Sequence, residues 1–99
     1  MHIRFERTGG LANIPLAADV DVDQLAVEDQ DHVRRLVEGS RFFELPASIE
    51  GSAGGVDRFR YRIAIVEGSH VHAIDVEETG MPLQLRPLVQ WLAAAARRR

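Results

Sequence analysis

The segment His70-Val71-His72 holds the residues best suited to bind a metal, because alternate residues of a β-strand point to the same face. Two histidines do not make a zinc site, which needs three or four ligands, and nothing in the sequence brings His2 or His32 to them. The chain has no cysteine, so it can form neither a thiolate zinc site nor a disulfide. We therefore expect no metal and no cofactor, and we interpret both histidines as part of an ordinary strand face.

Carboxylates are the second candidates for chemistry. Asp19, Asp21 and Asp23 alternate along one polar stretch, a spacing that general acid–base catalysis could use. Nothing nearby predicts the burial that would tune their pKa values, so a solvated face opposite arginines is the simpler interpretation. The serines lie in predicted turns with no implied histidine partner, which leaves a nucleophilic triad without support. These serines are Ser40, Ser48, Ser52 and Ser69. We expect a protein that is not an enzyme.

The glycine-rich and basic segments do not predict a phosphate or nucleic-acid site. The glycines of EGSAGG (50–55) lack phosphate-loop spacing, and the chain has no lysine to complete such a loop. A cationic helix C-terminus explains Arg97–Arg99, and a net charge of −3 with dispersed acids argues against nucleic acid. The apolar runs are shorter than the ~18 residues that a membrane span requires, and the start of the sequence shows no secretory apolar region. We expect a cytoplasmic binding module with neither a nucleic-acid nor a membrane partner.

The spacing of apolar residues along the sequence predicts the strands and helices that position these residues. Alternation with period two predicts four strands, and spacing near 3.6 predicts two helices. The predicted strands cover 2–6, 16–22, 57–67 and 70–78, and the predicted helices cover 25–39 and about 82–99. Gly39 is expected to end the first helix, and Pro87 indicates that the second helix could begin there instead of at Pro82. Segment 47–57 is interpreted as a surface loop.

This order predicts a single α+β domain over residues 1–99. The simplest packing is a four-stranded antiparallel sheet, in ββαββα order, with both helices on its apolar face. We expect Phe43 and Trp91 to be the aromatic residues whose burial matters most. The open face should carry arginines opposite acids, which keeps it soluble. These are Arg58, Arg60 and Arg62 on one side and Glu6, Asp19, Asp21 and Asp75 on the other.

The loop between the first two strands is longer and more apolar than a hairpin needs. Two to five residues suffice for a hairpin connection, and Gly9-Gly10 alone could supply the turn. The additional residues 11–14, Leu-Ala-Asn-Ile, either fold back as a small core against the sheet edge or are displayed for a partner. Because the hairpin does not need them for its own turn, we favour display.

Four stretches together resemble the emfourin family, small bacterial protein inhibitors of protealysin-like zinc metalloproteases with the thermolysin fold. They are FERTGGLANIP (5–15), LVEGSRFFELP (36–46), DRFRYRIAI (57–65) and LRPLVQWL (85–92). Their order and spacing span nearly the whole chain, which makes the match more specific than any single stretch.

The resemblance implies a tight protein ligand that fills the protease cleft, so the zinc belongs to the enzyme. Such proteases prefer a bulky apolar residue just after the scissile bond, a role that Leu11 or Ile14 would suit. We therefore assign protease binding, as a hypothesis, to one loop. Its residues are Gly9, Gly10, Leu11, Ala12, Asn13, Ile14 and Pro15. We expect the free protein to be a monomer.

Two other functions stay open at this point. A non-inhibitory interaction domain would use the same loop or an exposed sheet edge to recruit a partner. A small enzyme or metal carrier would depend on His70 and His72 instead. Inhibition assays against protealysin-like and thermolysin-like proteases, and the zinc content of the purified protein, separate these three.

Overall fold

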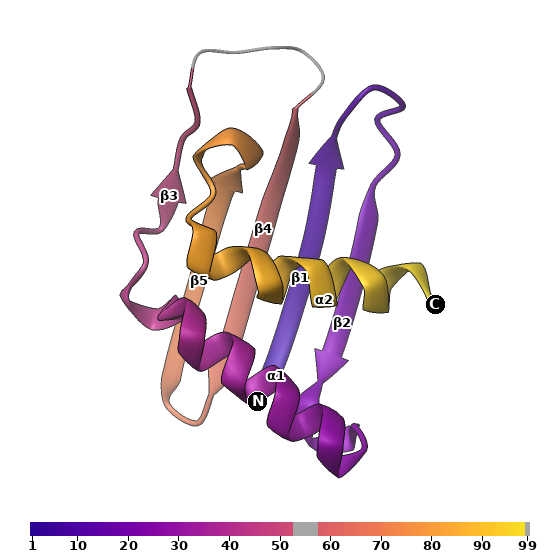
Figure 1. The fold of residues 1–99 in the computed structure, drawn as a ribbon, viewed down its shortest axis with the longest axis vertical. Helices are drawn as coiled ribbons and strands as arrows, with labels where there is room; N and C mark the ends of the chain where they lie inside the picture. Colours follow the sequence, from indigo (N-terminus) through magenta and orange to yellow (C-terminus); the bar gives the residue numbers. More distant parts are fainter. Residues whose placement is uncertain (53–57, 99) are drawn as a thin grey trace.

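Two antiparallel hairpins form most of the sheet in the computed structural model, which describes residues 1–52 and 58–98. The first pairs β1 (His2–Gly9) with β2 (Leu16–Asp21), so that Ile3 lies opposite Val20. The second pairs β4 (Phe59–Glu67) with β5 (His70–Glu77) through a turn in which Gly68 has a φ of 59°. β1 and β4 also pair antiparallel and join the hairpins at the centre of the sheet (Figure 1). The four predicted strands are confirmed.

A fifth strand, β3 (Ser48–Ile49), corrects the predicted four-stranded antiparallel sheet. The sheet is mixed, with the order β2-β1-β4-β5-β3, and β3 runs parallel to β5. The Asp75 N–H donates to the Ala47 carbonyl at 2.8 Å, and Arg60 binds the Glu50 carboxylate at 2.7 Å. These contacts join segments far apart in the sequence, and a two-residue strand carries no periodic signal, so this pairing was missed. Of the predicted surface loop 47–57, residues 53–57 lie outside the described part of the chain.

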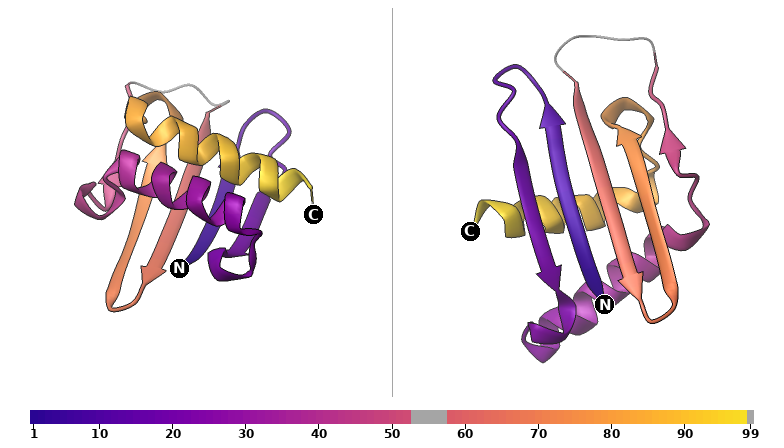
Figure 2. Two further views of the ribbon diagram at one scale, coloured as in Figure 1. Left: turned by 60° about the horizontal axis from the view of Figure 1, so that its bottom comes forward. Right: turned by 180° about the vertical axis from the view of Figure 1, so that it is seen from behind.

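Both helices cross the same face of the sheet (Figures 1 and 2). They are α1 (Val27–Ser40) and α2 (Arg86–Arg97), accompanied by the short 3-10 helices η1 (Val22–Gln24), η2 (Phe42–Glu44), η3 (Glu78–Gly80) and η4 (Leu83–Leu85). Pro87 lies in the first turn of α2, where its missing N–H has no intrahelical partner to lose. Neither helix, nor any other in the described ranges, has the length and apolar character that a membrane span requires.

The first helix does not end at Gly39 as predicted. It continues through Ser40, which is fully buried and donates its hydroxyl to the Val37 carbonyl at 2.7 Å. Arg41 then adopts the left-handed conformation at φ 53° and ψ 44°, the position where glycine is usual. The Ser40 hydroxyl satisfies a carbonyl of the last turn, and the helix ends one residue later than the sequence rule predicts.

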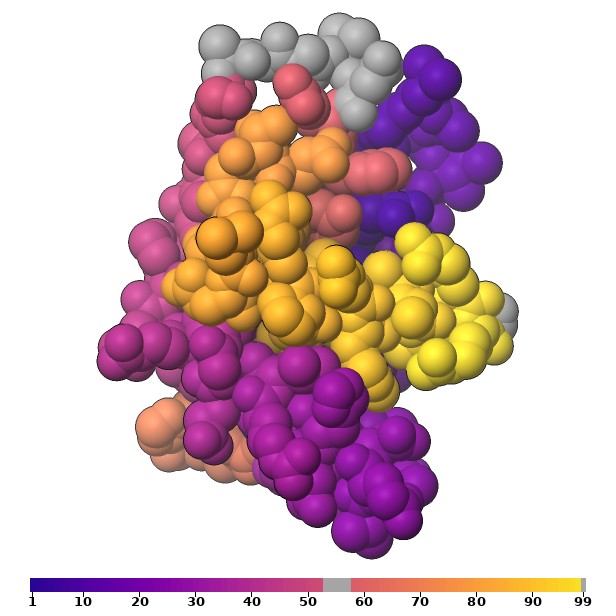
Figure 3. Space-filling model, in the orientation of Figure 1, coloured from indigo at the N-terminus to yellow at the C-terminus, as the bar shows by residue number. Residues whose placement is uncertain are grey.

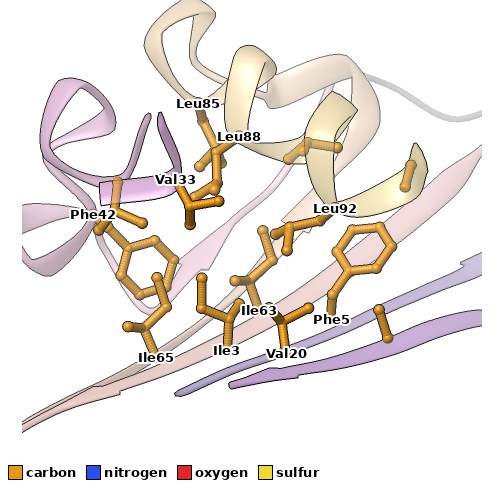
Figure 4. Close-up of a cluster of buried hydrophobic side chains, with 14 of the residues drawn as sticks. Ile3, Phe5, Val20, Val33, Phe42, Ile63, Ile65, Leu85, Leu88 and Leu92 are labelled. Carbon is orange, nitrogen blue, oxygen red and sulfur yellow. The ribbon is translucent and has the colours of Figure 1, made fainter. Parts of the chain in front are cut away.

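The hydrophobic core lies between the helices and the sheet (Figure 4). Phe5, Ile3, Ile63 and Ile65 rise from the central strands, where Figure 4 shows them facing Val33 of α1 and Leu88 and Leu92 of α2. Phe42, at 1% exposure, is the aromatic residue that closes the core beneath α1. The expectation for Phe43 and Trp91 was wrong, because both are only partly buried against this cluster.

The opposite face of the sheet is the one that neither helix covers (Figure 2, right). Its charges pair across strands, as predicted in general: Arg60 Nε lies 2.6 Å from Asp75 Oδ1, and Arg4 lies 3.3 Å from Asp19. Hydrogen bonding to Glu50 and the charge of Asp75 raise the pKa of Arg60. Arg62 lies opposite Glu6 and Asp75 in the register. The face is therefore held by exposed ion pairs that contribute little individually.

Candidate functional site

The loop that links β1 to β2 stands clear of the helices at one end of the sheet (Figure 3). The Leu11 side chain is 87% exposed and that of Ile14 is 71% exposed. Of the two alternatives for this loop, folding back as a small core does not agree with these exposures. The loop displays two large apolar side chains to solvent.

The backbone of the loop is held by two hydrogen bonds and three residues with positive φ. The Gly10 N–H donates to the Arg58 carbonyl at 3.1 Å, which ties the loop to the start of β4. The Asn13 N–H donates to the Gly10 carbonyl at 3.2 Å and closes a turn around Leu11 and Ala12. Gly9, Gly10 and Asn13 have φ values of 83°, 79° and 52°. These residue types tolerate that conformation, so the sequence suits the loop shape locally.

Both glycines are also required by close packing. A Cβ on Gly9 would lie 2.4 Å from the carbonyl oxygen of Arg58. A Cβ on Gly10 would lie 2.4 Å from the ring of Phe59. The pair therefore serves two purposes: it turns the chain, and it lets the loop rest directly on β4.

An aromatic cluster on β4 supports the loop from below. The Arg7 guanidinium lies 4.2 Å from the centre of the Phe59 ring, a cation–π geometry. Phe59 and Tyr61 have ring centres 6.3 Å apart, and the Phe59 N–H donates to the Glu78 carboxylate at 2.7 Å. Between this cluster and the loop lies a shallow hollow of about 290 Å³, whose lining includes Ile14 and Phe59 but not Leu11. Leu11 is not part of this hollow and is largely exposed.

Tyr61 marks the boundary between this cluster and the core. Burial raises the pKa of its phenol, while the nearby Arg7 cation acts in the opposite direction. The phenol is therefore neutral near pH 7. The loop end of β1 and β4 extends past α2 (Figure 1).

Both histidines of the HVH segment pack against aromatic residues of η2. Nε2 of His72 lies 2.7 Å from the Leu45 carbonyl, and its ring packs edge-on against Phe42. His70 packs in the same way against Phe43. No group of three or more potential ligands is gathered anywhere in residues 1–52 and 58–98. The two histidines act here as packing residues under η2.

The acids that were considered for catalysis are not brought together as an acid–base pair. Asp19 contacts Arg4 and His2; partial desolvation raises its pKa, but the hydrogen bonds to these residues outweigh it and lower the pKa overall. Asp21 accepts the Asp23 N–H at 3.1 Å, which caps η1. Asp23 belongs to η1 rather than to the strand, and it binds Arg34 at 2.8 Å. Their surroundings are those of a solvated, charged edge.

Comparison with known proteins gives one decisive match. The model of the Emfourin family covers residues 5–93, which takes in the hairpin loop, its aromatic support and most of both helices. The chain belongs to the Emfourin family. No curated protein and no solved structure matches it. Membership of the Emfourin family implies a protease-inhibitor role in general.

Within this Emfourin protein, sequence reasoning selected the loop but missed its support. Phe59 was assigned only to a strand face, and Arg7, just beyond the predicted strand 2–6, was given no role, although together they hold the loop in place. Alternation did place Phe59 and Tyr61 on the apolar face. It could not indicate that this end of the face lies beyond the helices, because that depends on where α2 crosses the sheet.

Proposed function

We propose that this chain inhibits a protealysin-like or thermolysin-like zinc metalloprotease by inserting the loop Gly9–Pro15 into the active-site cleft. Leu11 would be the main apolar anchor, in the pocket that accepts the residue after the scissile bond. The protease, and not this chain, would supply the zinc. The observation that carries the proposal is the 87% exposure of a leucine on a loop whose backbone is otherwise tied to β4.

Preorganisation supports this role. A protein ligand loses affinity whenever a flexible loop must be ordered on binding. Here the hydrogen bond between Gly10 and Arg58 and the close packing of Gly10 on Phe59 limit that cost. A short loop on a rigid sheet can therefore act as a tight ligand.

Leu11 is a better anchor than Ile14 for a geometric reason. Ile14 lines the hollow above Phe59, so part of its surface already faces this chain. Leu11 lines no part of that hollow and is free to enter a pocket. Ile14 and the aromatic cluster would then contact the rim of the cleft.

The test is the inhibition constant of four variants beside the parent, against one protealysin-like and one thermolysin-like protease. Truncating a buried interface anchor commonly costs about 2 kcal/mol, or roughly thirtyfold in affinity. We expect Leu11→Ala to weaken inhibition by about that factor, and Leu11→Asp to weaken it further because an unpaired charge must be desolvated. Thermal stability should not change.

Leu83 provides the matched control. It is also a leucine, it is 79% exposed, and it lies in η4 at a distance from the loop in the sequence. Leu83→Ala and Leu83→Asp should inhibit like the parent. If Leu11→Asp inhibits as well as the parent, the loop is not the reactive element. If the parent inhibits neither protease, the alternative of a non-inhibitory interaction domain is favoured.

A further inference from the structure

In the part of the chain that the structure describes, β2 is the outer strand of the sheet, and every second residue directs its backbone groups outward. The Val22 N–H donates to the Met1 carbonyl at 2.9 Å, and in the β1–β2 register this makes every second pair hydrogen-bonded, including Ile3–Val20 and Phe5–Ala18. The pairs between them are non-hydrogen-bonded. Ala17, Asp19 and Asp21 of β2 therefore direct their backbone N–H and C=O groups away from β1, toward the edge.

A groove runs beside this edge on the helix side of the sheet. It has a volume of about 400 Å³ and lies between the start of α1 and the end of α2. Figure 1 shows the C-terminal end of α2 passing over β2 and ending beyond it, so the helix overhangs the edge. The apolar part of the groove is lined by Ala18, Val20, Leu25, Trp91 and Ala95. A strand added beside β2 would place every second side chain in this groove.

The charges around the groove select the kind of strand that fits. Asp29 lies at its α1 end, and within the described ranges neither Asp29 nor Asp21 forms an ion pair with an arginine or a histidine, whereas Asp19 is paired with Arg4 and His2. Arg98 is the basic residue of the lining. The side chains of Asp19 and Asp21 face the open side of the sheet, opposite the groove. The second copy of this chain is a poor occupant, because antiparallel β2–β2 pairing would set these aspartates against each other.

We propose that the β2 edge is a second protein-binding site, which accepts an extended segment of a partner by strand addition. The segment carries apolar side chains at alternate positions, which enter the groove beside Trp91. The side chains between them are basic and lie opposite Asp19 and Asp21 on the open face. The backbone groups of Ala17, Asp19 and Asp21 hold the segment, and the groove and the acids select it. This site is separate from the Gly9–Pro15 loop.

A blocked heptapeptide, Lys-Val-Lys-Val-Lys-Val-Lys, serves as the probe. Trp91 is the single tryptophan of the chain, so its fluorescence reports directly on the groove. We expect a saturable change in this fluorescence that weakens with added salt. The same peptide with glutamate in place of lysine should bind at least tenfold more weakly. Two further peptides carry N-methyl groups on alternate amides, one on the odd-numbered residues and the other on the even-numbered residues. Only the peptide whose methyl groups face β2 should lose binding.

Three variants test the parts of the site. Ala17→Pro removes an outward N–H without removing a bond to β1, which an edge strand tolerates, and it should weaken peptide binding about tenfold. Asp21→Asn, which keeps a side-chain oxygen to accept the Asp23 N–H, should weaken it severalfold and reduce the salt dependence. Val71→Ala, at an exposed site near the far end of β5, is the control and should bind like the parent. Amide spectra of each variant establish that the fold is kept.

The outcome is independent of protease inhibition. Leu11→Asp should bind the peptide like the parent, since the loop does not take part. Equal binding by Ala17→Pro and the parent, or by both N-methylated peptides and the unmodified one, would overturn the proposal. A concentration-dependent dimer that Ala17→Pro abolishes would also overturn it, because the edge would then belong to a second copy.

Discussion

Tyr61 shows how a single residue reports on the boundary between the loop support and the core. Its ring contacts both Phe5 and Phe59, and burial disfavours the charged phenolate. Because the folded state then holds its proton to a higher pH than the unfolded state, the stability contributed by Tyr61 is present below pH ~10 and is lost as the pH rises through the folded pKa. Arg7 acts in the opposite direction by favouring the phenolate.

The tyrosine titration is directly measurable, because the chain has one tyrosine. We predict that tyrosinate absorbance gives a pKa above the ordinary value of about 10. Arg7→Ala should raise the pKa of Tyr61 further, since it removes a cation that stabilises the phenolate. Circular dichroism at each pH checks that the chain stays folded. A pKa at or below the ordinary value would mean that burial does not dominate the surroundings of the hydroxyl.

At the scale of elements, the β1–β2 hairpin depends on Gly9 for more than its turn. Gly9→Ala would combine a left-handed backbone with a Cβ 2.4 Å from the Arg58 carbonyl, the acceptor of the Gly10 N–H. We predict a loss of about 1–3 kcal/mol in the free energy of unfolding, measured by denaturant titration. Gly68→Ala is the matched control: it has φ +59° but open space at Cβ, so it should cost less. Equal losses would mean that the loop does not rest closely on β4.

At the end of α1, a substitution is expected to stabilise the fold. Arg41 holds a left-handed conformation that glycine adopts without strain. Its ion pair with Glu44, at 3.3 Å, joins two side chains about 70% exposed, so its loss should matter little. We predict that Arg41→Gly raises the free energy of unfolding by about 1 kcal/mol. Arg41→Ala loses the same ion pair and keeps the strain, so a gain of similar size in that variant would contradict this explanation.

At the scale of the whole molecule, the core depends on Phe42, which joins η2 and α1 to the sheet. Phe42 is 1% exposed and packs against His72 of β5, whereas Phe43 lies at the border of the cluster. We predict that Phe42→Ala lowers the free energy of unfolding by about 3–5 kcal/mol, and that Phe43→Ala lowers it clearly less. Denaturant unfolding of both variants makes the comparison. A larger effect for Phe43→Ala would mean that Phe43, and not Phe42, is the aromatic residue on which the core depends.

Much of this architecture is encoded locally and was therefore predicted from the sequence. Alternation placed Ile3, Phe5, Ile63 and Ile65 on the buried side of their strands, because each side chain follows the two-residue period whatever the strand order. The excess apolar residues of the β1–β2 loop indicated a displayed segment, since no local turn requires them. The 3.6-residue period indicated α2, and of the two starts that the prolines left open, Pro82 and Pro87, the structure agrees with Pro87.

Only the tertiary structure decided the features that depend on contacts distant in the sequence. The parallel pairing of β3 with β5 requires Ala47 and Glu50 to meet Asp75 and Arg60, which no local pattern specifies. The choice of Phe42 over its neighbour Phe43 depends on how η2 turns after the left-handed Arg41. The support of the loop by Phe59 depends on the β1–β4 register, and the groove beside β2 depends on where α2 crosses the sheet. Local periodicity determines which face of an element is apolar, but packing between distant elements determines which parts of that face stay open to a partner.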